Sequence, residues 1–253
     1  MKITVITLFP NMITPFFAES IVSRAQKKGL INLNIVNLRD YALDSYGTVD
    51  DRPYGGGAGM VLRIEPIVNA LKAHSDIAKK NAQRRILITS PQGSVFTQQK
   101  AGELAQMEEL VLIAGHYEAV DERVLQYVDE EVSMGDFVMT GGEIPAAAIV
   151  DSVVRLIPGV LKKSDATEQE SFFSVPLETI RSMIGNNAYL DEMQKKGRTV
   201  VTLLEYPHYT RPEQFENQIV PSELLSGDPK KIYAWEMRAA WDITMEKRPD
   251  LLK

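Results

Sequence analysis

Apolar residues follow two different spacings along the first 160 positions. Short continuous apolar runs, typical of buried strands, occupy residues 3–9, 33–38, 85–89 and 110–114. Between and after them, apolar residues recur at helical spacing, which predicts helices over residues 14–28, 65–80, 97–107, 121–128 and 143–157. This alternation predicts an α/β fold with a mainly parallel sheet and helices on both of its faces.

The pattern changes after residues 157–161. Residues 162–171 are polar, charged and without periodicity, so we interpret them as a linker between domains. Beyond the linker, helices are expected over residues 186–196, 221–226 and 228–246, and only 199–204 has an extended pattern. The sequence therefore predicts an N-terminal domain over 1–161 and a smaller, mostly helical domain over 172–253.

Three glycine-containing segments follow predicted strands of the first domain. They are Ser90–Gly93, Gly115–Glu118 and Ser133–Glu143, the last with three glycines and two carboxylates. Glycines after strands often only make turns, and we give that interpretation about even odds for any one segment. Three together favour a binding site, because open α/β sheets bind ligands at the carboxyl ends of their strands. Neither the GxGxxG nor the GxxxxGK[ST] nucleotide motif is present.

Composition narrows the classes of protein further. The chain has 253 residues, no cysteine and three histidines far apart, so we expect no disulfide and no cysteine or histidine metal site. It has no apolar run near the ~20 residues that span a bilayer and no signal-peptide pattern, so we expect a soluble, cytoplasmic protein. A formal charge of −6 argues against holding nucleic acid by bulk electrostatics. Local basic groups remain candidates, at residues 79–85, 162–163 and 195–198.

Several longer motifs carry a resemblance to a known family. They are Thr48–Gly57, Ser90–Gly93, Tyr117–Glu118 with Asp121–Arg123, Ser133–Glu143, Ile157–Leu161 and His208–Pro212. Together the motifs resemble the bacterial tRNA (guanine-N1)-methyltransferases of the trefoil-knot (SPOUT) class, over nearly the whole chain. The resemblance implies a homodimer, an N-terminal domain tied in a deep knot, a C-terminal domain that binds tRNA, and S-adenosylmethionine bound bent inside the knot.

The family's site residues fall on definite positions of this chain. The cofactor positions that the resemblance implies are Pro91, Gly115, Tyr117, Glu118, Met134, Gly135, Asp136, Phe137, Val138, Met139, Gly141 and Gly142. It implies Glu170 as general base and Arg155 as electrostatic stabiliser, with the linker carboxylate of one subunit over the cofactor of the other. No metal ligand is assigned, and assistance by a divalent cation such as Mg²⁺ stays open.

The chain departs from the family pattern at four positions or segments. His116 and Ala119 stand where the family commonly has arginine and glycine, and Glu170 stands where an aspartate usually precedes Ser-Phe, which leaves Asp165 as an alternative base. Residues 173–202 form an insert where the family usually has only a few residues. A cluster of Lys195, Lys196 and Arg198 in this insert could extend a tRNA surface, or the insert could be a surface elaboration.

The leading functional hypothesis is methyl transfer to N1 of the guanosine immediately 3′ of the anticodon. A knotted ribose 2′-O-methyltransferase is one alternative, although it would need no carboxylate to deprotonate a ring nitrogen. A non-catalytic RNA-binding knot protein is the other, and the presence of Arg155 and a carboxylate at 170 argues against it.

Overall fold

The structure is a computed structural model that describes residues 1–77, 81–162, 170–185 and 187–252. Its internal contacts divide the chain into two compact units, Met1–Ser164 and Asp165–Lys253. The two units are described separately.

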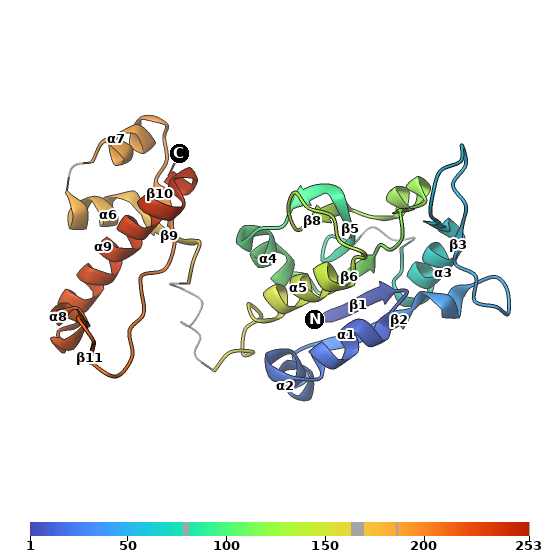
Figure 1. The fold of residues 1–253 in the computed structure, drawn as a ribbon, viewed down its shortest axis with the longest axis horizontal. Coiled ribbons are helices and arrows are strands. Elements are labelled where there is room, and N and C mark those ends of the chain that lie inside the picture. Colours follow the sequence, from blue (N-terminus) through green and yellow to red (C-terminus); the bar gives the residue numbers. More distant parts are fainter. Residues whose placement is uncertain (78–80, 163–169, 186, 253) are drawn as a thin grey trace. The chain divides into compact units, whose positions relative to one another are not determined.

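A five-stranded parallel sheet forms the centre of the first unit (Figure 1). Its spatial order is β2-β1-β6-β5-β8, and every neighbouring pair is parallel. The strands are β1 (Lys2–Thr7), β2 (Asn32–Asn37), β5 (Arg84–Val95), β6 (Glu109–Ala114) and β8 (Glu130–Ser133). The predicted α/β fold with a parallel sheet is confirmed.

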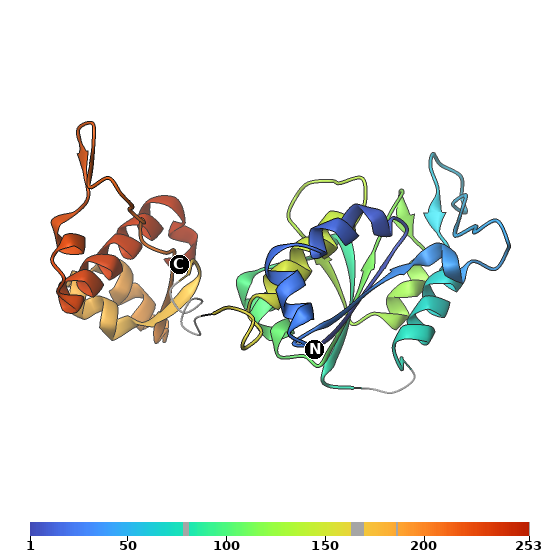
Figure 2. The same cartoon turned by 90° about the horizontal axis from the view of Figure 1, so that it is seen from below.

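Helices cover both faces of this sheet, as the continuous apolar strands require. Figure 2 shows the sheet between two helical layers. One layer holds α1 (Pro10–Phe17), α2 (Ser20–Lys27), α4 (Gln98–Ala105) and α5 (Glu143–Val154), and the other holds α3 (Ile64–His74) and the 3₁₀-helices η1 (Leu38–Tyr41) and η2 (Glu122–Tyr127). Successive residues of a strand point to opposite faces of the sheet. In β6, Leu112 packs against the first layer of helices and Ile113 against the second.

Some predicted boundaries are wrong. The single helix expected over residues 14–28 is two helices, because Ala18 closes the first with a hydrogen bond to Pro15 O and Ser20 takes a positive φ of 53°. The expected Ser90–Gly93 loop lies within β5, whose register with β8 shifts between Thr89 and Ser94. Helix α3 ends at His74 rather than Lys80.

The same unit contains a second, small sheet, and the long segment that follows η1 supplies two of its strands. It pairs β3 (Asp50–Asp51) with β4 (Val61–Leu62) and β4 with β7 (Ala119–Val120). The motif segment Thr48–Gly57 thus contains the strand β3 and is tied through β4 to the chain that follows β6.

The second unit is mostly helical, as predicted, and contains more strand than the sequence indicated. Strand β9 (Phe173–Pro176) pairs antiparallel with β10 (Val200–Leu203), and a hairpin joins β11 (Gln214–Phe215) to β12 (Gln218–Ile219). The helices are α6 (Leu177–Ile184), α7 (Ala188–Lys195), α8 (Ser222–Leu225), α9 (Pro229–Lys247) and the 3₁₀-helix η4 (Pro249–Leu252).

The insert supplies much of the hydrophobic core of this unit. Its buried residues pack with Met237, Ala240 and Trp241 of α9, and with Leu252. The contributing insert residues are Val175, Leu177, Ile180, Leu190, Met193 and Val201. The insert is therefore part of the body of the unit and not an elaboration of its surface. In the described part of the chain, no helix has both the length and the apolar character needed to cross a membrane.

Candidate functional site

A cavity of about 240 Å³ opens where β5, β6 and β8 of the main sheet end. The three glycine-containing segments converge on it, together with the residues of β7 and η2 that follow β6. Ten of the twelve predicted cofactor positions line it: Pro91, Gly115, Tyr117, Glu118, Met134, Phe137, Val138, Met139, Gly141 and Gly142. Segments far apart in the sequence thus form one wall, because the carboxyl ends of parallel strands meet at one edge.

Gly142 brings the segment after β8 against the segment after β6 at backbone distance. Its N–H donates to Gly115 O at 2.6 Å, and Gly115 N in turn donates to Thr89 Oγ1 at 3.3 Å. A Cβ on residue 142 would lie 1.9 Å from Thr89 Oγ1 and 2.7 Å from Gly115 N. No side chain fits at this position, so glycine is required here by close approach.

A buried carboxylate, Glu143, fixes the start of α5 behind the cavity wall. The side chain is fully buried, and its two oxygens have different partners: Oε1 accepts from Thr7 Oγ1 at 2.9 Å and Oε2 lies 3.2 Å from His116 Nδ1. The His116 ring also packs against Phe9, with 4.7 Å between ring centroids. Both carboxyl oxygens therefore have a polar partner, as burial of a polar group demands. A Cβ on Gly141 would lie 2.3 Å from both Glu143 Oε2 and His116 Nδ1.

Tyr117 and Glu118 stand at the junction of the cavity with the small sheet. Tyr117 has φ +62°, a left-handed conformation that is uncommon for a bulky residue. Glu118 N donates to Met60 O at 3.1 Å, and a Cβ on Gly59 would meet the Glu118 side chain at 2.3 Å. The glycine run before β4 therefore lets the chain pack directly on Glu118.

Gly135 and Asp136 lie in the same loop but are not among the residues that line the cavity. Gly135 (φ +134°) forms a tight turn in which Ser133 Oγ accepts from Gly135 N and donates to Gly135 O, both at 3.1 Å. The turn projects the following apolar side chains outward, and Val138 is 87% exposed at the cavity. Its neighbours Phe137 and Met139 are exposed as well, and contiguous exposed apolar side chains are typical of an interaction site.

One acidic group of the cavity lining is held in its ionised form. The side chain of Arg123 donates to both oxygens of Asp121, with Nη2 at 2.6 Å from Oδ2. These hydrogen bonds lower the pKa of the Asp121 carboxyl below its ordinary value. At neutral pH Asp121 is therefore ionised and forms an ion pair of no net charge with Arg123 on this side of the cavity.

The predicted catalytic residues do not line the cavity. Arg155 follows the last turn of α5, whose 12 residues span about 18 Å from the cavity wall at Gly142. Glu170 belongs to the second unit, and the alternative base Asp165 lies outside the described residues. The first unit thus brings the cofactor positions together and places Arg155 at the far end of α5 from them.

No role was predicted from the sequence for the buried network of Thr7, His116 and Glu143. Two features of the sequence could have indicated this network: the hydroxyl of Thr7 at the end of an otherwise apolar strand, and the carboxylate of Glu143 at the start of an apolar helix. Within the described ranges, no group of three or more His, Asp or Glu side chains is arranged to hold a metal ion.

The fold and the cavity define a class of protein: an α/β protein that binds a small organic ligand where its parallel strands end. The family model described as tRNA (Guanine-1)-methyltransferase TrmD matches residues 1–253. The chain belongs to this family, whose members transfer a methyl group from S-adenosylmethionine to a tRNA guanine.

Individual relatives match this chain over nearly its whole length. The tRNA (guanine-N(1)-)-methyltransferase of Clostridium acetobutylicum is 43% identical over 251 residues, which cover 99% of this chain and 90% of the relative. The proteins of the same name from Alkaliphilus metalliredigens and Desulfitobacterium hafniense are 43% and 46% identical, over 100% and 99% of this chain and 92% and 84% of the relatives. The recognition made from the motifs is confirmed.

Proposed function

We propose that this enzyme methylates N1 of the guanosine immediately 3′ of the anticodon, acting in the cytoplasm as a homodimer with shared active sites. One observation carries the proposal: the chain matches the methyltransferase family from end to end, and the three glycine-containing motif segments converge on one cavity. The alternatives of ribose methylation and of RNA binding without catalysis do not fit this family.

S-adenosylmethionine suits the chemistry of the cavity wall. Backbone groups reach the cavity where glycines leave room, at Gly115, Gly141 and Gly142, and apolar Met134 and Val138 offer surface for a purine ring. When bound, this molecule supplies an electrophilic methyl group. The two predicted positions outside the lining, Gly135 and Asp136, act by shaping the turn that presents Phe137, Val138 and Met139.

The protein must also activate the nucleophile. N1 of guanine carries a proton, and negative charge spreads to O6 when that proton leaves, so the site needs a base and a cation. Glu170 accepts the N1 proton, and the Arg155 guanidinium stabilises the charge on O6. These are the roles that the resemblance implies for the two positions.

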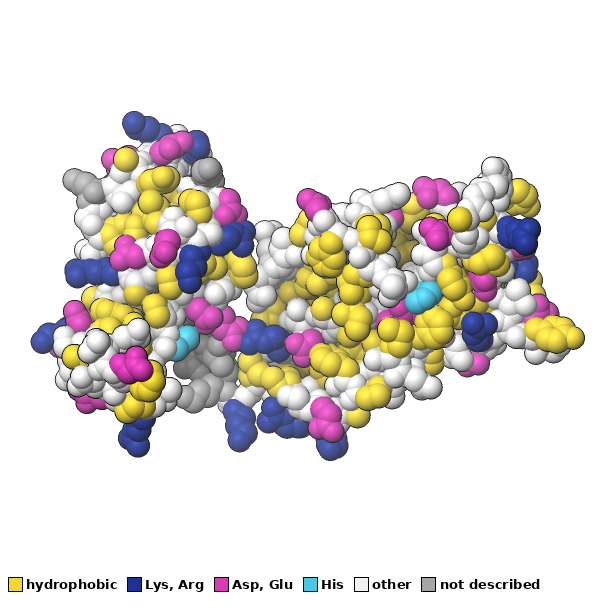
Figure 3. Space-filling view, in the orientation of Figure 1, with side chains coloured by type: hydrophobic (Ala, Val, Ile, Leu, Met, Phe, Trp, Pro, Cys, Tyr) yellow, Lys and Arg dark blue, Asp and Glu magenta, His cyan; other side chains and the backbone are white. Residues whose placement is uncertain are grey.

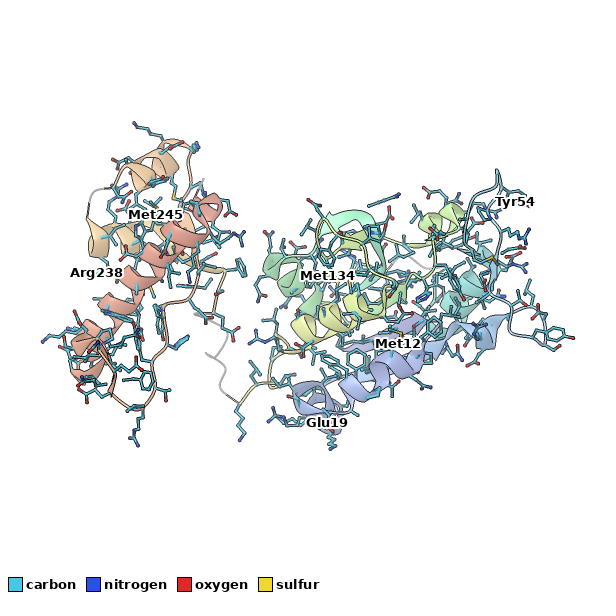
Figure 4. The ribbon with its side chains drawn as sticks, in the orientation of Figure 1. Met12, Glu19, Tyr54, Met134, Arg238 and Met245 are labelled. Atoms are coloured by element: carbon cyan, nitrogen blue, oxygen red, sulfur yellow. The ribbon has the colours of Figure 1, made fainter. Side chains whose placement is uncertain are left out.

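A second copy of the chain accounts for the distance between Arg155 and the cavity. Arg155 lies the length of α5 away from the cavity wall of its own chain. In a dimer, the Arg155 side chain of one subunit can instead lie at the cavity of the other subunit. Apolar side chains gather over α1 and α5 in Figure 3, and Figure 4 labels Met12 on α1. Met12, Phe16 and Ile144, on these two contacting helices, are 49%, 51% and 53% exposed. Such an apolar face is typical of a subunit interface.

The domain assignment follows from the same resemblance. Residues 1–161 form the knotted catalytic domain, 162–171 the linker, and 172–253 the tRNA-binding domain with its insert. The knot is supported by the direct packing of residues 141–142 on 115–116, which form a β-bridge at His116 and Gly141.

The decisive experiment uses labelled S-adenosylmethionine and paired tRNA transcripts that differ only by guanosine or adenosine after the anticodon. We expect labelling of the guanosine transcript alone, and digestion should recover the label as N1-methylguanosine. Equal labelling of the two transcripts would refute the proposed target nucleotide.

The base assignment has its own test. Glu170→Gln should lower turnover by about 10² or more, in line with general-base contributions, and should leave S-adenosylmethionine binding unchanged. Glu178→Gln, an exposed position on α6, is the matched control and should keep full turnover. If Glu170→Gln is fully active and Asp165→Asn is not, Asp165 is the base.

A further inference from the structure

The residues around Glu170 form a strained turn, defined here as the Glu170 turn (Glu170–Phe173). Phe173 N donates to Glu170 O at 3.0 Å, which closes the turn, and Phe172 at its third position has φ +75°. A positive φ at this position favours glycine or asparagine, and a bulky residue adopts it only where the surroundings enforce it. Strain of this kind is concentrated at functional sites.

The Phe172 ring is held from outside by a cation. The guanidinium carbon of Arg248 lies over the ring, 5.7 Å from its centroid, within the range of a cation–π interaction. Arg248 itself is fixed by Asp250, which accepts from Nε at 2.9 Å and from Nη2 at 2.7 Å. The bidentate pair sets the plane of the guanidinium and thereby its position over the ring.

Backbone hydrogen bonds fix the other side of the turn to the strand β10 and its continuation. Phe172 N donates to Leu203 O at 2.7 Å, and Glu205 N donates to Ser171 Oγ at 3.3 Å. Leu204 N, between these two contacts, donates to Thr244 Oγ1 of α9 at 2.9 Å. The turn is therefore bound to the insert strand and, through it, to the long helix of the second unit (Figure 1).

We propose that Phe172 and Arg248 are positioning residues that hold the Glu170 turn rigidly on the C-terminal unit, so that this unit carries the catalytic carboxylate. The proposal rests on the assignment of Glu170 as base. The proposal further states that the Glu170 carboxylate moves as one body with the C-terminal unit, the unit that binds tRNA. Placing the tRNA on this unit then places the base relative to the target guanine, and a freely moving linker would not do so.

The test compares Phe172→Ala and Arg248→Ala with two conservative variants and a control. Loss of the ring or of the cation should lower kcat for tRNA methylation about tenfold to a hundredfold, as small misplacements of a catalytic group do. The KM for S-adenosylmethionine and the thermal midpoint of unfolding should stay near wild type. Phe172→Tyr, which keeps the ring, should retain most of the rate, and Arg248→Lys, which keeps the charge but loses the bidentate pair, should retain less of it. Arg181→Ala removes a comparable Arg–Asp pair, with Asp191, and should not change kcat.

A double variant separates positioning from a general structural role. If Arg248 acts through Glu170, adding Arg248→Ala to Glu170→Gln should cost no further rate, because the group that it positions is already inactive. An equal loss in both backgrounds would overturn the proposal, and so would full activity of Phe172→Ala and Arg248→Ala beside a slow Glu170→Gln. Full activity of Glu170→Gln would instead overturn the base assignment, and this proposal with it.

Discussion

At the scale of single residues, the wall of the cavity depends on two glycines, Gly141 and Gly142, which have no Cβ atom. At Gly141 and Gly142 a Cβ would lie within 2.3 Å of atoms belonging to His116, Glu143 or Thr89. Because the two glycines have no side chain, the segment after β8 packs directly on the segment after β6. This packing forms the wall where we place the methyl donor. A methyl group at residue 142 would have to push this wall apart.

Gly142→Ala should therefore weaken S-adenosylmethionine binding. Overpacking costs about 1–3 kcal/mol, which corresponds to roughly a tenfold to hundredfold rise in Kd if the cavity absorbs the strain. Isothermal titration calorimetry measures the affinity, and a thermal melt reports whether the variant is folded. Gly102→Ala is the control, because a Cβ there meets no atom within 4 Å and alanine favours the helix. Unchanged affinity of Gly142→Ala would contradict the proposed cofactor wall.

Single residues also show where prediction from the sequence stops. Glycines after apolar runs mark the binding loops, because few other residues make such turns. The partner of a buried carboxylate is different: Thr7 and Glu143 are 136 positions apart, and only the order of strands brings them within 2.9 Å. Likewise, Phe172 has no sequence feature that reveals its positive φ.

The insert changes the interpretation of the C-terminal unit at the scale of elements. Strands β9 and β10 pair with each other, and α6 and α7 between them bury Ile180 and Leu190 against α9. The cationic cluster of the insert is less available than its sequence suggests, because Lys196 lies 2.7 Å from Glu192 and Arg198 donates to Leu251 O at 3.4 Å. The insert therefore acts first as core.

Leu190→Ala should destabilise this unit by about 2–5 kcal/mol, since it removes a fully buried side chain and leaves a cavity. Both tryptophans of the chain, Trp235 and Trp241, lie in this unit, so tryptophan fluorescence during urea unfolding reports on it selectively. Leu225→Ala, at a position 50% exposed, should change the free energy of unfolding by no more than about 0.5 kcal/mol. Equal midpoints for the two variants would show that the insert is not part of the core.

A second prediction at this scale concerns the contact of α4 with β8. Lys100 Nζ lies 3.0 Å from Glu130 Oε2, and Ser94 Oγ donates to Oε1 at 2.8 Å. Burial raises the pKa of Glu130, but the hydrogen bonds and the charge of Lys100 outweigh it, and the net shift is downward. A lowered pKa stabilises the fold above the unfolded value of 4.5, and this stabilisation is lost as the pH falls through the folded value.

Lys100→Met should therefore reduce the free energy of unfolding by about 0.5 kcal/mol at pH 7, and by less at pH 3. Urea titrations at the two pH values give the difference directly. Lys72→Met, at an exposed position on α3, is the control and should show no such dependence. A deficit that is as large at pH 3 as at pH 7 would mean that packing of the lysine stem, and not its charge, holds α4 to β8.

Elements were predictable where a long pattern defined them. The apolar runs of β1, β2 and β6 could be buried only in a parallel sheet, and their positions were predicted to within about two residues. Strand β9 has four residues and ends at Pro176, so it carries no pattern of its own and forms only because β10 pairs with it. Strand β5 continues through Ser90–Gly93, where the local residues favour a turn, because β8 supplies partners again at Ser94.

The arrangement of catalytic groups matters at the scale of the whole molecule. The first unit holds the cofactor positions at one end of α5 and Arg155 at the other. A shared site in a dimer resolves this separation and predicts that defects in different parts of the site can complement each other.

Mixing Gly142→Ala with Glu170→Gln tests the shared site. In a heterodimer, one active site combines the intact cofactor wall of one chain with the intact Glu170 of the other. After subunit exchange at equal amounts, activity should recover to about a quarter of wild type, because half the dimers are mixed and each has one intact site. Each variant exchanged with itself is the control. No recovery, with light scattering confirming mixed dimers, would place the wall and the base in the same chain.

The strand order has a consequence for how the protein is made. β1 lies between β2 and β6, and its Lys2 pairs with Glu109, so one edge of β1 has no partner until more than a hundred further residues have been synthesised. At about 5–20 residues per second, translation leaves this edge open for roughly 5 to 20 s. An open apolar edge invites pairing with other chains. Until β6 has emerged, this edge of β1 is therefore open to pairing with other chains.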